Sequence, residues 1–105
     1  MPAFLFRLVP PRPDFASTMG TAERATMVEH VAYWTTQAEQ GAVVAFGPVA
    51  DPAGEYGIGI VVVEDRAAAE ALRDADPAMR SPHGFRTELL DMPALVTEHG
   101  RTRSP

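Results

Sequence analysis

The order of four short apolar stretches and two helical segments constrains the fold of this chain more than any other feature. Runs of branched and aromatic residues bounded by Pro, Gly or Asp predict strands, while apolar residues three or four apart predict helices. Strands are expected over residues 3–9, 42–46, 56–63 and 85–90, and helices over 21–40 and 66–75. The resulting β-α-β-β-α-β order is that of the ferredoxin-like fold, an α+β unit whose four-stranded antiparallel sheet carries two helices on one face.

The predicted strands are apolar on both faces. VVAF at 43–46 and GIGIVVV at 57–63 show no regular alternation of apolar and polar residues. Two helices cover only one face of the sheet, and a large bare apolar face is not tolerated on a monomer in water. We therefore expect a homodimer in which the open sheet faces of two copies pack together.

Four residues are expected to fix the helix ends. Thr21 is a favourable N-cap for the first helix, and Gly41 is a natural stop, since glycine tolerates the left-handed backbone that often follows a helix. Asp65 is expected to cap the second helix. Asp76 is expected to end it, because a residue before proline is pushed out of the helical region.

One stripe of the first helix is expected to face the core. At about 100° per residue, Met27, Val31, Trp34 and Ala38 fall within about 60° of one another. We therefore expect these four side chains to pack against the sheet.

Missing residue types exclude several chemistries. The 105 residues contain no Cys, and all nine basic residues are Arg, which excludes thiolate, disulfide and lysine Schiff-base chemistry, including pyridoxal phosphate anchoring. The net charge of -5 and the lack of a basic stripe argue against a nucleic-acid partner. No apolar run is long enough to span a membrane and no leader is evident, so the cytoplasm is the expected compartment. Residues 1–92 are expected to form one domain, and 93–105 a weakly patterned tail that frays.

His30 and Asp76 are the strongest candidates for chemistry. His30 lies at the edge of the predicted core stripe, where it can face a cavity between helix and sheet or be half-buried and inert. Asp76 before Pro77 is common turn chemistry, but in this topology the first helix begins at the end where the second helix finishes. The two side chains can therefore meet, and a carboxylate on a histidine fixes its tautomer and stabilises its charged form.

Other polar residues each have two possible roles. Arg7 and Glu88 interrupt neighbouring apolar strands, where they can form a cross-strand ion pair, or Arg7 can bind an anionic group in the cavity. His83 can line the same pocket or be exposed, and His99 is expected to be solvated in the tail. The three histidines show no metal-ligand spacing, and no phosphate loop or dinucleotide fingerprint is present, so neither a metal nor a cofactor is expected.

The loop over residues 10–21 is longer than a plain connection and starts where the site is expected. Phe15 and Met19 are its large apolar residues, and we expect one or both to cover the cavity and exclude water from His30. The alternative is a loop that packs passively on the helices or on a partner subunit. Phe15 and Trp34 are the apolar side chains expected to contact a ligand.

Four segments of the chain resemble the YCII-related family over about residues 3–92. They are HVAYW in the first helix, FGPVADPAGEYG through the second turn, ADPAMR followed by GFRTELLDM, and the PPRP loop. The resemblance implies the dimeric α+β barrel form of the ferredoxin-like fold, and a polar pair at His30 and Asp76. Ser81 and Pro82 stand where many relatives carry a small pair such as Ala-Gly, a departure that stiffens this turn.

The leading functional hypothesis is a small enzyme of lyase or isomerase type without metal or organic cofactor. His30 would take a proton from a small, cyclic, oxygenated substrate, Asp76 would orient it, and Arg7 or His83 would hold an anionic group. The alternative is a non-catalytic ligand-binding or accessory module of the same fold. A cofactor-independent monooxygenase is the third hypothesis, and fold analogy alone does not choose among the three.

Overall fold

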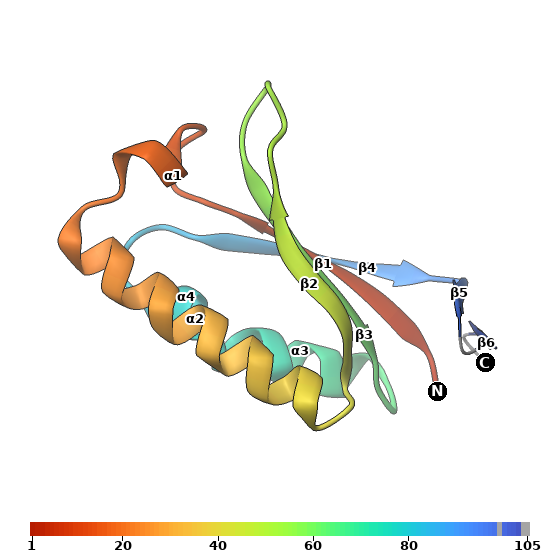
Figure 1. The fold of residues 1–105 in the computed structure, drawn as a ribbon. Helices are drawn as coiled ribbons and strands as arrows, with labels where there is room; N and C mark the ends of the chain where they lie inside the picture. Colours follow the sequence, from red (N-terminus) through yellow and green to blue (C-terminus); the bar gives the residue numbers. More distant parts are fainter. Residues whose placement is uncertain (99, 104–105) are drawn as a thin grey trace.

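Four strands form one antiparallel sheet in the order β2-β3-β1-β4, which is the order of the ferredoxin-like fold expected from the sequence (Figure 1). The computed structural model describes residues 1–98 and 100–103. The sheet strands are β1 (Ala3–Val9), β2 (Val43–Val49), β3 (Tyr56–Val62) and β4 (Arg86–Met92). The longer helices are α2 (Thr21–Glu39) and α3 (Arg66–Ala75), and both lie on one face of the sheet. Single helical turns form α1 (Phe15–Thr18) and α4 (Pro77–Arg80).

Local hydrogen bonds determine where α2 begins and ends. The Gly20 N–H donates to the Glu23 side chain over 2.8 Å, so Gly20 is the N-cap and Thr21, the predicted cap, is already the first helical residue. At the other end Gly41 has a φ of 90°, as predicted for a glycine stop. The N–H groups of Gly41 and Ala42 donate to carbonyl groups of the last helical turn, which satisfies acceptors that the helix leaves open.

The second helical segment also ends as predicted. Asp65 caps α3, its side chain accepting the Ala68 N–H over 2.8 Å. Asp76 leaves the helical region at ψ 127° before Pro77, and it then serves as the N-cap of α4 by accepting the Ala78 N–H over 2.9 Å. One carboxylate therefore ends one helix and starts the next.

Strand β2 is longer than the sequence indicated. Residues 47–49, expected to belong to the turn, continue the strand, and Pro48 pairs opposite Gly57 of β3. A proline fits here because β2 lies at the edge of the sheet, where its missing N–H removes no ladder bond.

The segment after Pro93, where a weakly patterned tail is expected, contains two short strands. It forms a separate two-stranded antiparallel sheet from β5 (Ala94–Thr97) and β6 (Gly100–Arg103), and Leu95 is buried. Each strand has only four residues, too few for a periodic pattern to be visible in the sequence. His99, expected to be solvated, lies outside the described residues.

Trp34 is the centre of the core between α2 and the sheet, as predicted. Its ring is buried, and its centroid lies 5.5 Å from that of Phe6 on β1. Met27 and Ala38 of the predicted stripe are half-buried, but Val31 is 49% exposed, so its expected place in the core is wrong.

Tyr33, which lies outside the predicted stripe, also packs against the core. Its ring packs edge-on against Trp34 with centroids 5.1 Å apart, and its hydroxyl donates to the Leu72 carbonyl over 2.7 Å. Burial, and to a lesser degree the charge of Asp76, raise the pKa of Tyr33. The half-buried tyrosine is stable here because its hydroxyl has an acceptor in the Leu72 carbonyl.

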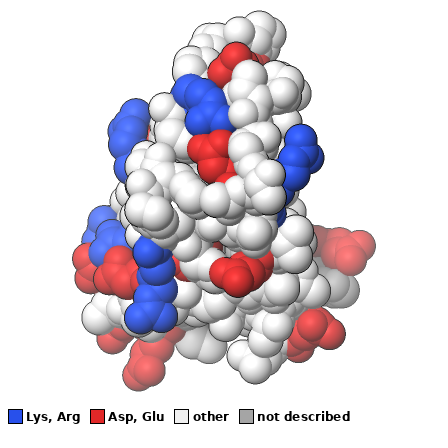
Figure 2. Space-filling model, turned by 90° about the vertical axis from the view of Figure 1, so that its left-hand side faces the viewer, with Lys and Arg blue, Asp and Glu red and all other residues white. Residues whose placement is uncertain are grey.

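None of the helices in the described residues combines the length and the apolar character that a membrane span requires. Figure 2 shows acidic and basic side chains scattered among uncharged surface on the face it draws, without a continuous basic band.

The face of the sheet that the helices leave open carries both apolar and charged side chains. Residues directly opposite in antiparallel strands share a face, so Leu5 lies beside Leu90, and Arg7 beside Glu88. Arg7 and Glu88 form an ion pair of 3.0 Å, and Leu90 is 50% exposed. We propose that a second copy of the chain covers this face.

Light scattering should then give about twice the chain mass of 11.3 kDa at micromolar concentration. Leu90→Arg should shift the protein toward monomer, because it places an unpaired charge in the apolar part of the interface. Val28→Arg, at a 71% exposed position of α2, is the matched control and should leave the mass unchanged. A wild-type protein that stays monomeric at these concentrations contradicts the dimer.

Candidate active site

His30 and Asp76 meet as the sequence predicted, although they are 46 residues apart. The Nδ1 atom of His30 lies 2.9 Å from both carboxylate oxygens of Asp76. The Asp76 side chain is almost completely buried, and the His30 side chain is 14% exposed. His30 comes from the middle of α2 and Asp76 from the break between α3 and α4, so the pair joins three helices at one point.

Two further donors fix the Asp76 carboxylate. The Trp34 Nε1–H donates to Oδ2 over 2.8 Å, and the Ala78 N–H donates to Oδ1 over 2.9 Å. A carboxylate can only accept, so His30 carries its hydrogen on Nδ1 and donates it to Asp76. The other ring nitrogen, Nε2, then has a free lone pair and can accept a proton.

Nε2 of His30 is not completely buried. No hydrogen bond to Nε2 is found among the described residues, and within these residues no buried side-chain nitrogen or oxygen lacks a partner. An atom without a protein partner that is not buried must face open space. That space is a cavity of about 410 Å³ between α2 and the sheet, and His30 lines it.

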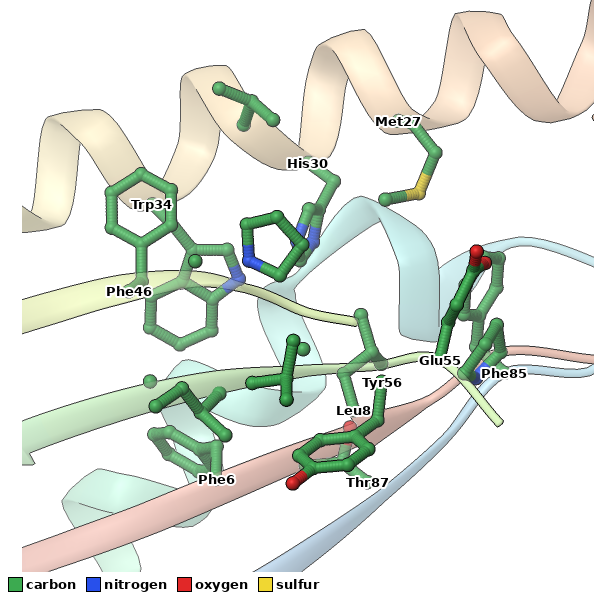
Figure 3. Close-up of a pocket in the computed structure, with 18 of the residues that line it drawn as sticks. Phe6, Leu8, Met27, His30, Trp34, Phe46, Glu55, Tyr56, Phe85 and Thr87 are labelled. Carbon is green, nitrogen blue, oxygen red and sulfur yellow. The ribbon is translucent and has the colours of Figure 1, made fainter. Parts of the chain in front are cut away.

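Figure 3 shows how helix and sheet enclose the cavity. Met27, His30 and Trp34 come from α2, while Phe6 and Leu8 come from β1 below them. Phe46, Tyr56, Phe85 and Thr87 lie along the remaining walls. The lining is therefore mainly apolar, with few polar groups, which is typical of a small-molecule site.

Two glycines of β3 create the hollow. Phe46, Gly59 and Phe6 form one row across the sheet on the helix side, and Pro48, Gly57 and Leu8 form the next. Each row has a glycine where a side chain would fill the space under α2. In the following row the β3 position is Val61, which is fully buried and ends the hollow.

The loop before α2 closes one end of the cavity. Phe15 and Met19 both line it, as expected, and Phe15 is buried edge-on against Phe85 with ring centroids 5.1 Å apart. The Ala16 N–H donates to Glu55 Oε2 over 2.8 Å, which ties the loop to the start of β3. The sequence indicated a long loop that covers the cavity, but it did not reveal the helical turn α1 or the contact of the loop with Glu55.

Arg12 fastens the same loop to the first turn of α2. Its two terminal nitrogens donate to the Glu23 carboxylate over 2.9 and 2.7 Å, and Nε donates to the Thr18 hydroxyl over 2.7 Å. The Arg12 guanidinium, with help from the Gly20 N–H, lowers the pKa of Glu23 from its ordinary value of 4.5 to about 2. The fastening therefore persists through the neutral pH range.

Two predicted ligand-holding residues lie outside the cavity, and their placement in it is wrong. Arg7 is on the open face of the sheet, paired with Glu88 and lying over the Tyr56 ring at 4.4 Å. Its position follows from strand alternation, since its neighbours Phe6 and Leu8 point to the helices. His83 contacts α2 at the Thr26 hydroxyl over 3.0 Å and does not line the cavity.

Within the described residues, no three side chains of His, Cys, Asp or Glu gather closely enough to hold a metal ion.

The domain model of the YCII-related domain matches residues 3–93, which is most of the chain. The chain belongs to the YCII-related domain family. The match spans the whole four-stranded sheet and every helix, including both residues of the His30–Asp76 pair. No curated protein matches this YCII-related chain.

Asp76 should be essential for the stability of this YCII-related domain. Asp76→Ala leaves the buried Trp34 and Ala78 donors without an acceptor, and should lower the free energy of unfolding by about 3 kcal/mol. Asp74→Ala, two residues earlier and largely exposed, is the matched control and should change stability little. Urea denaturation of both variants measures the difference, and equal effects would contradict the structural role of Asp76.

The Arg12–Glu23 pair should stabilise the fold in a pH-dependent way. The pKa of Glu23 is lowered on folding, so its contribution is complete above about 4.5 and is lost as the pH falls toward about 2. The difference in unfolding free energy between wild type and Glu23→Gln should be constant at neutral pH and shrink over that acid range. In an Arg12→Ala background most of this pH dependence should disappear. A difference that stays flat from pH 6 to pH 2 would argue against the pair.

Proposed function

We propose that the chain is an enzyme of lyase or isomerase type in which His30 acts as a general base on a small cyclic oxygenated substrate. The observation that carries the proposal is the orientation of His30, whose Nδ1 is fixed by buried Asp76 while Nε2 faces an apolar cavity. A base needs a free lone pair within reach of the substrate, and this geometry supplies one.

Asp76 supports the charged form of the base. When Nε2 takes a proton, His30 becomes an imidazolium, and the carboxylate 2.9 Å from Nδ1 stabilises that charge. The N–H groups of Trp34 and Ala78 hold the carboxylate in place. The His30 ring, which is bonded to this fixed carboxylate, therefore keeps its orientation. The pair is therefore organised before the substrate arrives.

The proton removed by Nε2 comes from a carbon next to a carbonyl group, where the electron pair of the C–H bond moves into an enolate. In an isomerase, the imidazolium returns the same proton to a different atom of the enolate. In a lyase, the electron pair re-forms a double bond as the leaving group departs, and the imidazolium passes its proton to that group. Neither the isomerase nor the lyase reaction needs an additional reactant. Holding the histidine base and the C–H bond in contact makes the proton abstraction fast.

Exchange of carbon-bound hydrogen for deuterium tests the proton transfer without knowledge of the natural substrate. Small cyclic ketones and lactones incubated with the protein in D₂O should exchange the hydrogens next to the carbonyl faster than without protein. His30→Gln and Asp76→Asn should lower this catalysed rate by about 10²- to 10⁴-fold, and NMR measures it. Val28→Ala, on the exposed face of α2, is the control and should leave it unchanged.

Exchange that is unaffected by both substitutions would overturn the proposal. Compounds that bind in the cavity without any catalysed exchange would favour the alternative, a ligand-binding module of the same fold. Oxygen consumption with a phenolic compound would favour a cofactor-independent monooxygenase.

A further inference from the structure

We infer that the cavity takes an uncharged, planar ring compound that lies against the bare backbone of β3 at Gly57 and Gly59. The inference rests on the proposed function only for the position of the reacting atom, at Nε2 of His30. It names the substrate class from two independent properties of the cavity, its shape and its charge.

The shape of the cavity favours a flat molecule. Gly57 and Gly59 present two stretches of backbone without side chains, and the flanking positions of the same rows carry bulkier side chains. Trp34 and Phe6, whose ring centroids are 5.5 Å apart, together form an aromatic wall beside this space. A ring can stack on such surfaces over its whole area, whereas a puckered molecule of the same size contacts them at a few points.

The charge of the cavity disfavours an anion. Asp76 and Glu55 both line it, and a neutral His30 leaves the pair with Asp76 at one negative charge. The arginine in the lining, Arg73, has its guanidinium bonded to Asp74 over 2.8 Å. An anionic ligand would therefore lose its water without gaining an unpaired cation, which is costly.

The position of Arg7 removes the expected anion holder. The side chain lies on the opposite face of the sheet, and its charge is already matched by Glu88 at 3.0 Å. His83 is likewise turned to Thr26 on α2. The chemistry of the wall thus points away from carboxylate-bearing ring compounds and toward neutral ketones, lactones or phenols.

Three probes of nearly equal size separate shape from charge. Acetophenone is planar and neutral, benzoate is planar and anionic, and acetylcyclohexane is neutral but not planar. Isothermal titration calorimetry at pH 7 should show that acetophenone binds at least about tenfold more tightly than either of the other two. Equal or tighter binding of benzoate, equal binding of acetylcyclohexane, or no binding of acetophenone at millimolar concentration each overturns the inference.

A substitution at Gly59 tests whether the ligand binds in the hollow. A Cβ added at Gly59 would lie 3.8 Å from Phe46 Cβ and 3.9 Å from a Phe6 ring atom, which are ordinary contacts, so Gly59→Val can be accommodated while its methyl groups fill the hollow. It should abolish acetophenone binding, and Ala25→Val on the exposed face of α2 should not. If Gly59→Val does not fold by circular dichroism, Gly59→Ala replaces it and should weaken binding several-fold. Unchanged binding in a folded variant overturns the inference.

Glu55→Gln tests the charge argument directly. It removes one negative charge from the wall and keeps an oxygen that can accept the Ala16 N–H. Benzoate should gain affinity relative to acetophenone, and an unchanged ratio would contradict the role of Glu55.

The same titrations with His30→Gln separate this inference from the proposed function. The order of the three probes should persist in this variant, because shape and charge do not depend on proton transfer. If the order persists but wild type catalyses no deuterium exchange, the proposed function fails and the ligand class stands. If exchange is catalysed but the order is different, the ligand class fails and the proposed function stands.

Discussion

The buried Asp76 carboxylate is the interaction on which the rest of this structure depends. It ends α3, starts α4, accepts from the core residue Trp34 and orients His30. A single charged group without partners would be far too costly to bury, so the three donors, His30, Trp34 and the Ala78 N–H, are required together. The same hydrogen bonds to Asp76 therefore both pack the helices and align the candidate base. Stability and chemistry cannot be varied separately at this position.

Much of the fold and the central pair of the site could be predicted from the sequence, because the relevant signals are local. Strand runs, the Asp65 cap, the Gly41 stop and the Asp76–Pro77 break depend on a few neighbouring residues. The element order then defines one topology, and that topology brings the end of α3 to the side of α2. The meeting of His30 with Asp76 follows from these two steps together.

The remaining details depend on tertiary partners that a local pattern does not contain. Tyr33 packs against the core because a carbonyl of α3 lies within reach of its hydroxyl, a contact that helical periodicity does not contain. Glu55 belongs to the cavity because the preceding loop folds back over it through Ala16. Arg7 is different, because strand alternation beside Phe6 already favours the open face, and hence the ion pair with Glu88, over the cavity.

The hollow exists because Gly57 and Gly59 have no side chains. Gly57 and Gly59 line the cavity from β3, whereas the His30–Asp76 pair lies on the helix side, so the volume of the cavity can vary independently of the pair. Replacing either glycine by alanine or a larger residue would reduce the volume of the cavity in small steps, while the His30–Asp76 pair stays intact. Within this architecture, the size of the cavity can therefore vary at β3 while the His30–Asp76 pair stays constant.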